Sequence, residues 1–198
     1  MALVDDFLTD LDRRWSPTGS EKIVLHVIGS TALMLRTGYE RGTKDSDVLE
    51  TAALTDDIKD RLRALAGKDT ALHARHGLYL DIVSQAIPFL PQRPLLHPLP
   101  KLNATLRHFS VEVLDVVDVV VTKLKRFNSA DASDIKAMVD RSLVDHRTLV
   151  ERFRSAVDMF SGEARAEDLP RYVRHLHRVE RDYLLVEESK IDLPDWIA

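Results

Sequence analysis

The chain has 198 residues, with 28 Lys and Arg against 32 Asp and Glu, a formal net charge of −4, 44% hydrophobic residues and no cysteine. An apolar share near the globular average supports a packed core and excludes a chain that is disordered throughout. The absence of cysteine excludes disulfides, thiol nucleophiles and Cys-ligated metal centres. The negative net charge argues against a protein that coats DNA.

The sequence predicts neither a secretory leader nor a membrane span. The first apolar residues run directly into Asp5 and Asp6, which does not match the basic start and apolar stretch of a leader. The best apolar run, residues 116–121, is short and interrupted by Asp118. We therefore expect a cytoplasmic protein that makes no membrane contact.

The first 114 residues mix helix and strand patterns. In chain order, the spacing of apolar residues predicts a helix at 3–15, a buried β-branched strand at 23–28, a short helix at 31–36, a strand at 45–49, an amphipathic helix at 56–66, a strand at 77–83 and another at 106–114. Residues 86–105 hold five prolines and are expected to be a loop.

Helical patterns dominate after residue 115. They cover 116–127, 133–143, 146–160 and 168–188. The order of elements predicts an α+β fold, in which a small mixed β-sheet is flanked by helices and followed by a helical C-terminal part. We expect an α/β core at 1–114 and a helical region at 115–198 that packs on it.

Two acidic residues one position apart are the most informative feature. Asp45 and Asp47 would project from the same face of a strand, so both carboxylates can converge on one hard cation such as Mg²⁺. Asp81 is an acid inside an otherwise apolar strand, where a charge needs a partner or an ion. A third carboxylate on a neighbouring strand would allow a second metal or a base for an attacking hydroxyl.

A glycine-serine turn upstream supplies a complementary feature. Gly29 and Ser30 end the buried strand and open a helix. Glycine lets a ligand approach the backbone, serine can cap the helix, and the unpaired N–H groups with the positive end of the helix dipole attract anions. A phosphate-binding turn and a carboxylate pair are the two halves expected of a nucleotide–metal site.

These residues resemble a known family. The run His26–Leu35, followed by Arg41-Gly-Thr43 and Asp45-Ser-Asp47, is similar to the nucleotidyltransferase superfamily of the DNA polymerase β type. The Arg-x-Thr-x-Asp-x-Asp form most resembles minimal bacterial members found as toxin–antitoxin components, including abortive-infection and DUF6036-like families. The likeness covers residues 23–49 well and 78–83 and 111–140 loosely.

The resemblance implies a nucleotidyltransferase-like fold and assigns roles to single residues. It implies that Asp45, Asp47 and Asp81 are catalytic and bind Mg²⁺ or Mn²⁺, and that the nucleotide is bound by Gly29, Ser30, Lys123 and Asp134. The implied reaction moves a nucleoside monophosphate from an NTP to a hydroxyl of a protein, an RNA or a small molecule. A cognate toxin or antitoxin protein is the implied partner, and a catalytically inactive antitoxin or regulatory binding protein is the alternative.

Each feature also has a simpler interpretation. Asp45 and Asp47 follow Lys44 and could form an ordinary charged turn, and Asp81 could pair with a neighbouring cation. Ser46 stands where the family usually has an apolar β-former, which favours an edge strand or a looser one. In the last helix, Arg171, Arg174, Arg178 and Arg181 flank an apolar seam; they are either a solvated rim or a row that guides an RNA or a partner protein.

Overall fold

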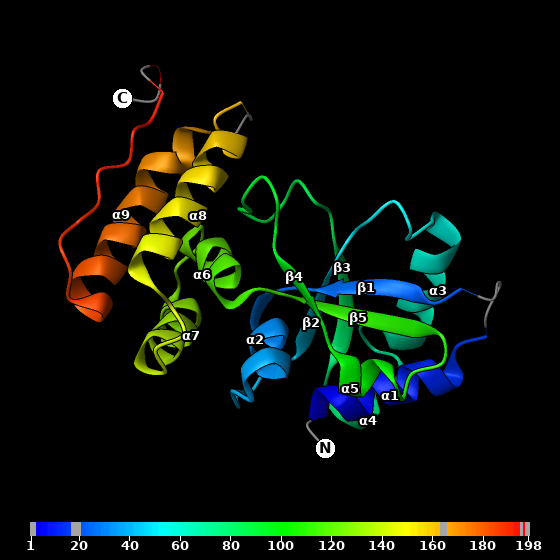
Figure 1. The fold of residues 1–198 in the computed structure, drawn as a ribbon. Coiled ribbons are helices and arrows are strands. Elements are labelled where there is room, and N and C mark those ends of the chain that lie inside the picture. The colour runs from blue at the N-terminus through cyan, green and yellow to red at the C-terminus, as the bar shows by residue number, and fades with distance from the viewer. Residues whose placement is uncertain (1–2, 17–20, 163–165, 195, 197–198) are drawn as a thin grey trace. The chain divides into compact units, whose positions relative to one another are not determined.

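The computed structural model describes residues 3–16, 21–162, 166–194 and 196, and the fold is α+β (Figure 1). The chain forms two compact units, each described separately below. The first unit comprises residues 1–87 and 96–114, and the second comprises 88–95 and 115–198. The segment 88–95 therefore leaves the part of the chain that the sequence assigned to the α/β core.

The first unit is a five-stranded mixed sheet with helices. Its elements are α1 (Leu3–Arg14), β1 (Ile23–Val27), α2 (Gly29–Thr37), β2 (Asp45–Leu49), α3 (Asp56–Ala66), α4 (Ala71–His76), β3 (Tyr79–Val83), β4 (Leu96–Pro98), α5 (Pro100–Asn103) and β5 (Phe109–Leu114). The strand order is β3-β2-β1-β5-β4. The β1–β5 and β2–β3 pairs are parallel, whereas β1–β2 and β4–β5 are antiparallel.

The two faces of the sheet differ because successive side chains alternate between them. One face carries most of the buried apolar residues of the strands, among them Leu25, Val27, Val48, Leu80, Val111 and Val113. The other face carries the polar positions His26, Asp47, Asp81 and Glu112. His26 and Glu112 are paired in register, and Nε2 of the histidine lies 3.2 Å from Oε2 of the glutamate.

Three elements of this unit lie outside the sequence prediction. Residues 86–105, expected to be a loop, contain the short strand β4 and the single helical turn α5. The helix α4 lies between the predicted helix at 56–66 and the next strand, and its start is capped by the hydroxyl of Thr70. With three and four residues, β4 and α5 are too short to show a repeated apolar pattern.

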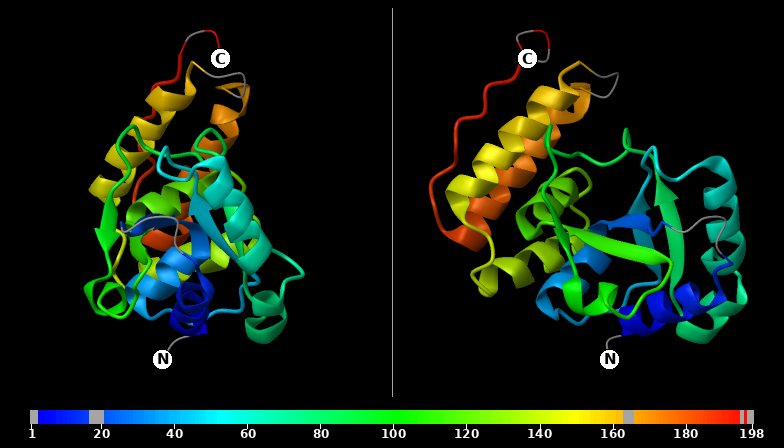
Figure 2. Two further views of the ribbon diagram at one scale, coloured as in Figure 1. Left: turned by 90° about the vertical axis from the view of Figure 1, so that its right-hand side faces the viewer. Right: turned by 45° about the vertical axis from the view of Figure 1, so that its right-hand side comes forward.

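The second unit is helical. It contains α6 (Val116–Leu124), α7 (Ser129–Asp140), α8 (His146–Phe160), the 3₁₀ turn η1 (Ala166–Asp168), α9 (Leu169–Val179) and the π-helical turn η2 (Glu180–Leu184). Helices α8 and α9 lie side by side in every view (Figure 2). The predicted helix at 168–188 ends early, because Leu185 adopts a left-handed φ of 56°.

Segment 88–95 belongs to this unit through both apolar and polar contacts. The ring of Phe89 makes edge contacts with Phe153, Phe160 and Tyr172 at centroid distances of 5.0 to 5.3 Å. The buried carboxylate of Asp118 pairs with both Nε and Nη2 of Arg152 at 2.6 Å and also accepts the backbone N–H of Leu95. None of the helices described is long and apolar enough to cross a membrane.

Candidate nucleotide and metal site

Strands β2 and β3 place the three predicted carboxylates on one face of the sheet. Asp47 is the register partner of Asp81, and Asp45 is the register partner of Tyr79. Neighbouring strands lie about 4.8 Å apart, and register partners project to the same side. The side chains of Asp47 and Asp81 therefore start close enough together to bind one cation between them.

The charges of all three acids act on the hydroxyl of Tyr79. Partial burial raises the pKa of the Tyr79 hydroxyl above its ordinary value, and the charges of Asp45, Asp81 and Asp47 raise it further. A negative potential next to a phenol favours its protonated form. The three acids thus act together on this end of the face, and such a group of negative charges is expected to attract a divalent cation.

Asp47 also lies against the first residue of helix α2. Gly29 has a positive φ of 65°, and a Cβ built on it would lie 2.9 Å from Oδ2 of Asp47. The backbone is tied at the same point, since the N–H of Ile28 donates to the carbonyl of Asp47 at 2.9 Å. Glycine is required here both by the backbone conformation and by the approach of the carboxylate.

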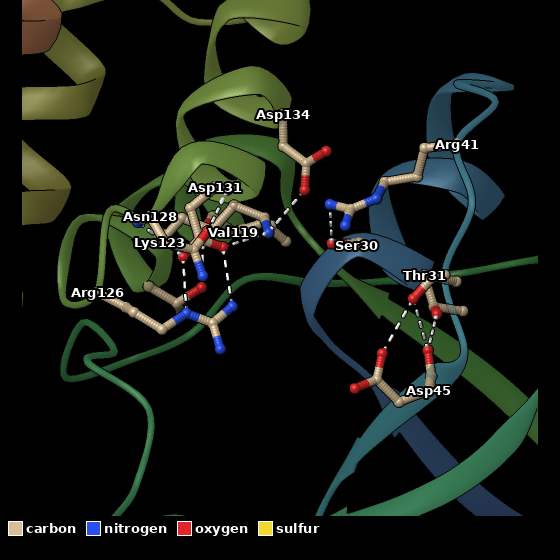
Figure 3. A network of polar contacts seen from close by, with 12 residues as sticks. Ser30, Thr31, Arg41, Asp45, Val119, Lys123, Arg126, Asn128, Asp131 and Asp134 are labelled. Carbon is tan, nitrogen blue, oxygen red and sulfur yellow. Dashed lines mark hydrogen bonds and ion pairs between the residues drawn. The ribbon is translucent and has the colours of Figure 1, made fainter.

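The start of helix α2 carries groups that can bind an anion. Its N-cap residue, Ile28, provides no side-chain hydrogen bond, and no acid lies in its first turn. Nη1 of Arg41 donates to the hydroxyl of Ser30 at 3.0 Å, which brings a guanidinium to the helix start (Figure 3). Backbone N–H groups, the helix dipole and an arginine together suit a phosphate.

Arg41 and Thr43 are residues to which the sequence analysis gave no role. Thr43 Oγ1 lies 3.0 Å from Oδ1 of Asp45 and 3.1 Å from its carbonyl oxygen. The hydroxyl of Thr31 donates to the same carbonyl at 3.1 Å (Figure 3). The available signal was the spacing of Arg41 and Thr43 from the acidic pair within one short motif.

Ser46 lies in an interior strand, so the expectation of an edge strand was wrong. Strand β2 is hydrogen-bonded to β3 on one side and to β1 on the other. The side chain of Ser46 is buried on the apolar face, and within the described part of the chain its hydroxyl has no hydrogen-bond partner. A polar atom in this position costs stability.

In the second unit, Lys123 and Asp134 form part of a buried ionic cluster. Nζ of Lys123 lies 2.8 Å from Oδ2 of Asp134 and 3.1 Å from Oδ1 of Asp131 (Figure 3). Arg126 donates to both carboxylate oxygens of Asp131 at 2.8 and 3.1 Å. Helix α7 starts at Ser129, four residues before the predicted start, because Asn128 and Asp131 form a capping box.

The charges of this cluster balance. Burial raises the pKa of the Asp131 carboxyl, but hydrogen bonds from Arg126 and the charge of Lys123 outweigh burial and hold that pKa below its ordinary value. Asp131 is therefore ionised at neutral pH. Lys123, which the family resemblance assigns to the triphosphate, is in contact with two carboxylates of its own unit.

The arginine row of α9 and η2 is largely neutralised. Arg171 pairs with Asp168 at 3.0 Å and Arg178 with Asp182 at 3.4 Å, while Arg181 contacts both Asp182 and Glu188. Exposed pairs of this kind add little stability, but they offset the positive charge that an RNA would meet. Three of the four arginines thus pair with acids, which lowers the net positive charge of the row.

The comparison with known protein families matches residues 7–183 to the family described as "Nucleotidyltransferase of unknown function (DUF6036)". The chain belongs to this family. The searches of curated proteins and of solved structures gave no match. The family description agrees with the resemblance carried by the glycine-serine turn and the acidic pair.

A nucleotidyltransferase generally uses a divalent metal, and the donors on β2 and β3 suit one. Among the described residues, no group of three or more His, Cys, Asp and Glu side chains is arranged to hold a metal ion. Mg²⁺, however, is usually bound by one or two carboxylates, with water and substrate phosphates completing six oxygen ligands. The paired positions of Asp47 and Asp81 fit that requirement in number and in chemistry.

Proposed function

We propose that this family member transfers a nucleoside monophosphate from an NTP to a hydroxyl group of a protein, an RNA or a small molecule. The proposed cofactor is Mg²⁺ or Mn²⁺, and the proposed setting is a toxin–antitoxin type system in the cytoplasm. The observation that supports it most is the position of Asp47, which is opposite Asp81 in register and in contact with the first residue of α2. A metal-binding acid beside a phosphate-binding helix start is what nucleotidyl transfer needs.

In the proposed reaction the acceptor hydroxyl gives its proton to a carboxylate of the acidic face and its oxygen attacks the α-phosphorus; a new P–O bond forms, the α–β anhydride bond breaks and pyrophosphate leaves. A bound divalent cation would supply charge neutralisation on the phosphates. Asp47 and Asp81 would hold that cation, and Asp45 would complete the acidic face. The N–H groups at the start of α2 and the guanidinium of Arg41 would orient the triphosphate, so that the reacting atoms start in line.

The test compares two isosteric variants with one control. Asp47→Asn and Asp81→Asn each remove one charge from the paired positions, and Asp57→Asn removes the same charge from an exposed site on α3. We expect label transfer from an α-labelled NTP to fall at least 100-fold in the first two variants and to be unchanged in the third. Equal transfer by all three variants and the wild type would end the proposal.

A catalytically inactive antitoxin or regulatory protein is the second candidate. One observation favours it: Lys123 is buried between Asp131 and Asp134 and is neutralised by them. This candidate predicts no NTP-dependent product and a stable complex with a partner protein. A thermal-shift screen of the four NTPs with Mg²⁺ and Mn²⁺ separates the two, because a ligand that binds only the folded state raises the melting temperature.

A further inference from the structure

The loop between α2 and β2 contacts both halves of the candidate site. Arg41 reaches Ser30 at the start of α2, and its Nε also donates to the carbonyl of Gly42 at 3.3 Å. Two residues later, Thr43 contacts the first residue of β2, Asp45. The loop is thus attached at one end to the helix start and at the other to the acidic strand.

Asp45 lacks the packing that Asp47 has, so a hydrogen bond that orients its side chain matters. It is exposed and is the first residue of its strand, whereas Asp47 lies further along β2 and against Gly29. An exposed carboxylate at a strand end samples several rotamers, and ordering it on metal binding costs conformational entropy. A hydrogen bond that already fixes the side chain reduces that cost.

The arrangement around Asp45 favours donation of the Thr43 hydroxyl proton to the carboxylate of Asp45. The hydroxyl of Thr43 has one proton and two acceptors in reach, the carbonyl oxygen and Oδ1 of Asp45. The carbonyl already accepts the hydroxyl of Thr31 at 3.1 Å. Donation from Thr43 to Oδ1, which is also the charged acceptor, is therefore the stronger arrangement.

We propose that Thr43 is a positioning residue for the metal: its hydroxyl holds Oδ1 of Asp45, which would leave Oδ2 available to a cation held mainly by Asp47 and Asp81, and Arg41 keeps the loop in place through Ser30. The inference rests on the proposed function, because it needs a cation on the acidic face. Acids that bind metals are commonly oriented by a hydrogen bond to the oxygen atom that the metal leaves unused, and losing that bond costs 10- to 100-fold in metal affinity. A merely structural threonine would affect stability without affecting metal affinity.

The experiment measures Mn²⁺ binding directly, by the loss of the free-ion signal in electron paramagnetic resonance. Five proteins are compared: the wild type, Asp45→Asn, Thr43→Val, Thr43→Ser and Thr105→Val. Thr105 is a control in the same unit, since its hydroxyl donates only to the nearby carbonyl of Leu102 among the contacts described. Melting temperatures of all five establish that each variant is folded.

We expect the wild type, Thr43→Ser and Thr105→Val to bind Mn²⁺ alike, and Thr43→Val to bind it roughly 10- to 100-fold more weakly. If Asp45→Asn loses affinity but Thr43→Val binds as the wild type does, the inference is overturned and the metal site stands. If Thr43→Ser is as weak as Thr43→Val, a hydroxyl contact is not the cause and the inference is also overturned. If the wild type binds no Mn²⁺, the proposed metal-dependent function fails, and the role of Thr43 fails with it.

Discussion

Replacing Gly29 by alanine should weaken metal binding and transfer without an unusual loss of stability. The new Cβ would lie 2.9 Å from Oδ2 of Asp47, whereas ordinary contacts begin at 3.4 Å. The carboxylate must therefore move by at least 3.4 − 2.9 = 0.5 Å. The end of a flexible side chain can make that shift at little cost in folding energy, but it leaves the position that we propose for metal binding.

Gly38→Ala is a matched control for the backbone. Gly38 has a φ of 64°, against 65° for Gly29, and a Cβ on it would meet nothing within 4 Å. Both substitutions carry the penalty of a left-handed alanine, about 1 kcal/mol after the loss of unfolded-state entropy is counted. For a chain of this size that corresponds to a fall of roughly 2–4 °C in melting temperature.

The assays are thermal unfolding, Mn²⁺ binding and label transfer from an α-labelled NTP. We expect equal melting temperatures for the two variants, with Mn²⁺ affinity and transfer reduced about 10- to 100-fold in Gly29→Ala alone. Equal function in the two variants would refute the reasoning, because it would mean that the contact between Gly29 and Asp47 has no bearing on the site.

Three further predictions concern stability. Ser46→Ala removes a buried hydroxyl for which no partner is described, so the free energy of unfolding in urea should rise by about 1 kcal/mol; a fall would contradict the assignment of that atom as unpaired. Lys123→Met removes a buried cation that contacts the carboxylates of Asp131 and Asp134 and should lower the free energy of unfolding by about 3–5 kcal/mol, whereas a lysine that serves only to bind nucleotide would leave stability unchanged. The pKa of Asp131 is lower in the folded protein than the value of about 3.9 in the unfolded chain, so its contribution to stability is complete above about pH 4 and is lost as the pH falls through the folded pKa. Asp131→Asn should therefore flatten the acid limb of the stability curve measured by urea unfolding below about pH 4, and an unchanged acid limb would argue against the shift.

The sequence was sufficient to predict features that depend on local periodicity. The same-face placement of Asp45 and Asp47 follows from the two-residue repeat of a strand, and the start of a helix at Gly29 follows from an apolar run that ends at a glycine-serine pair. The family match then agrees with the chemistry that these residues suggested.

What the sequence could not provide depends on contacts between distant segments. The pairing of Asp47 with Asp81 requires β3 to lie beside β2 in parallel register, and strand order is not encoded in periodicity. Ser46 favoured an edge strand or a looser one, because a polar residue is unfavourable in an interior strand. In the structure β2 is an interior strand, and it carries the buried hydroxyl of Ser46 without a described hydrogen-bond partner. The contact of Lys123 with Asp134 depends on the turn between α6 and α7.

The end of the last helix illustrates a different limit. The arginines and apolar residues of α9 continue their spacing beyond residue 179, so the pattern extends the helix to 188. Instead the helix continues as a π-helical turn and ends at Leu185, which has a left-handed φ. Because this residue is not a glycine, the sequence gives no signal that the helix ends there. Buried Glu180 pairs with His146 and accepts the backbone N–H of Ser189, which explains why the chain turns back here.

The insertion of Phe89 into the aromatic cluster of the helical unit has a consequence for biosynthesis. This side chain leaves the ribosome together with the sheet strands, long before Phe153, Phe160 and Tyr172 have been made. The ring of Phe89 cannot make these contacts until helices α8 and α9 have been synthesised. A fragment that starts at Asp115 would therefore lack Phe89, the ring at the centre of this aromatic cluster. Because the helical unit is built from two separate stretches of chain, a fusion at a single junction does not exchange the whole unit between relatives.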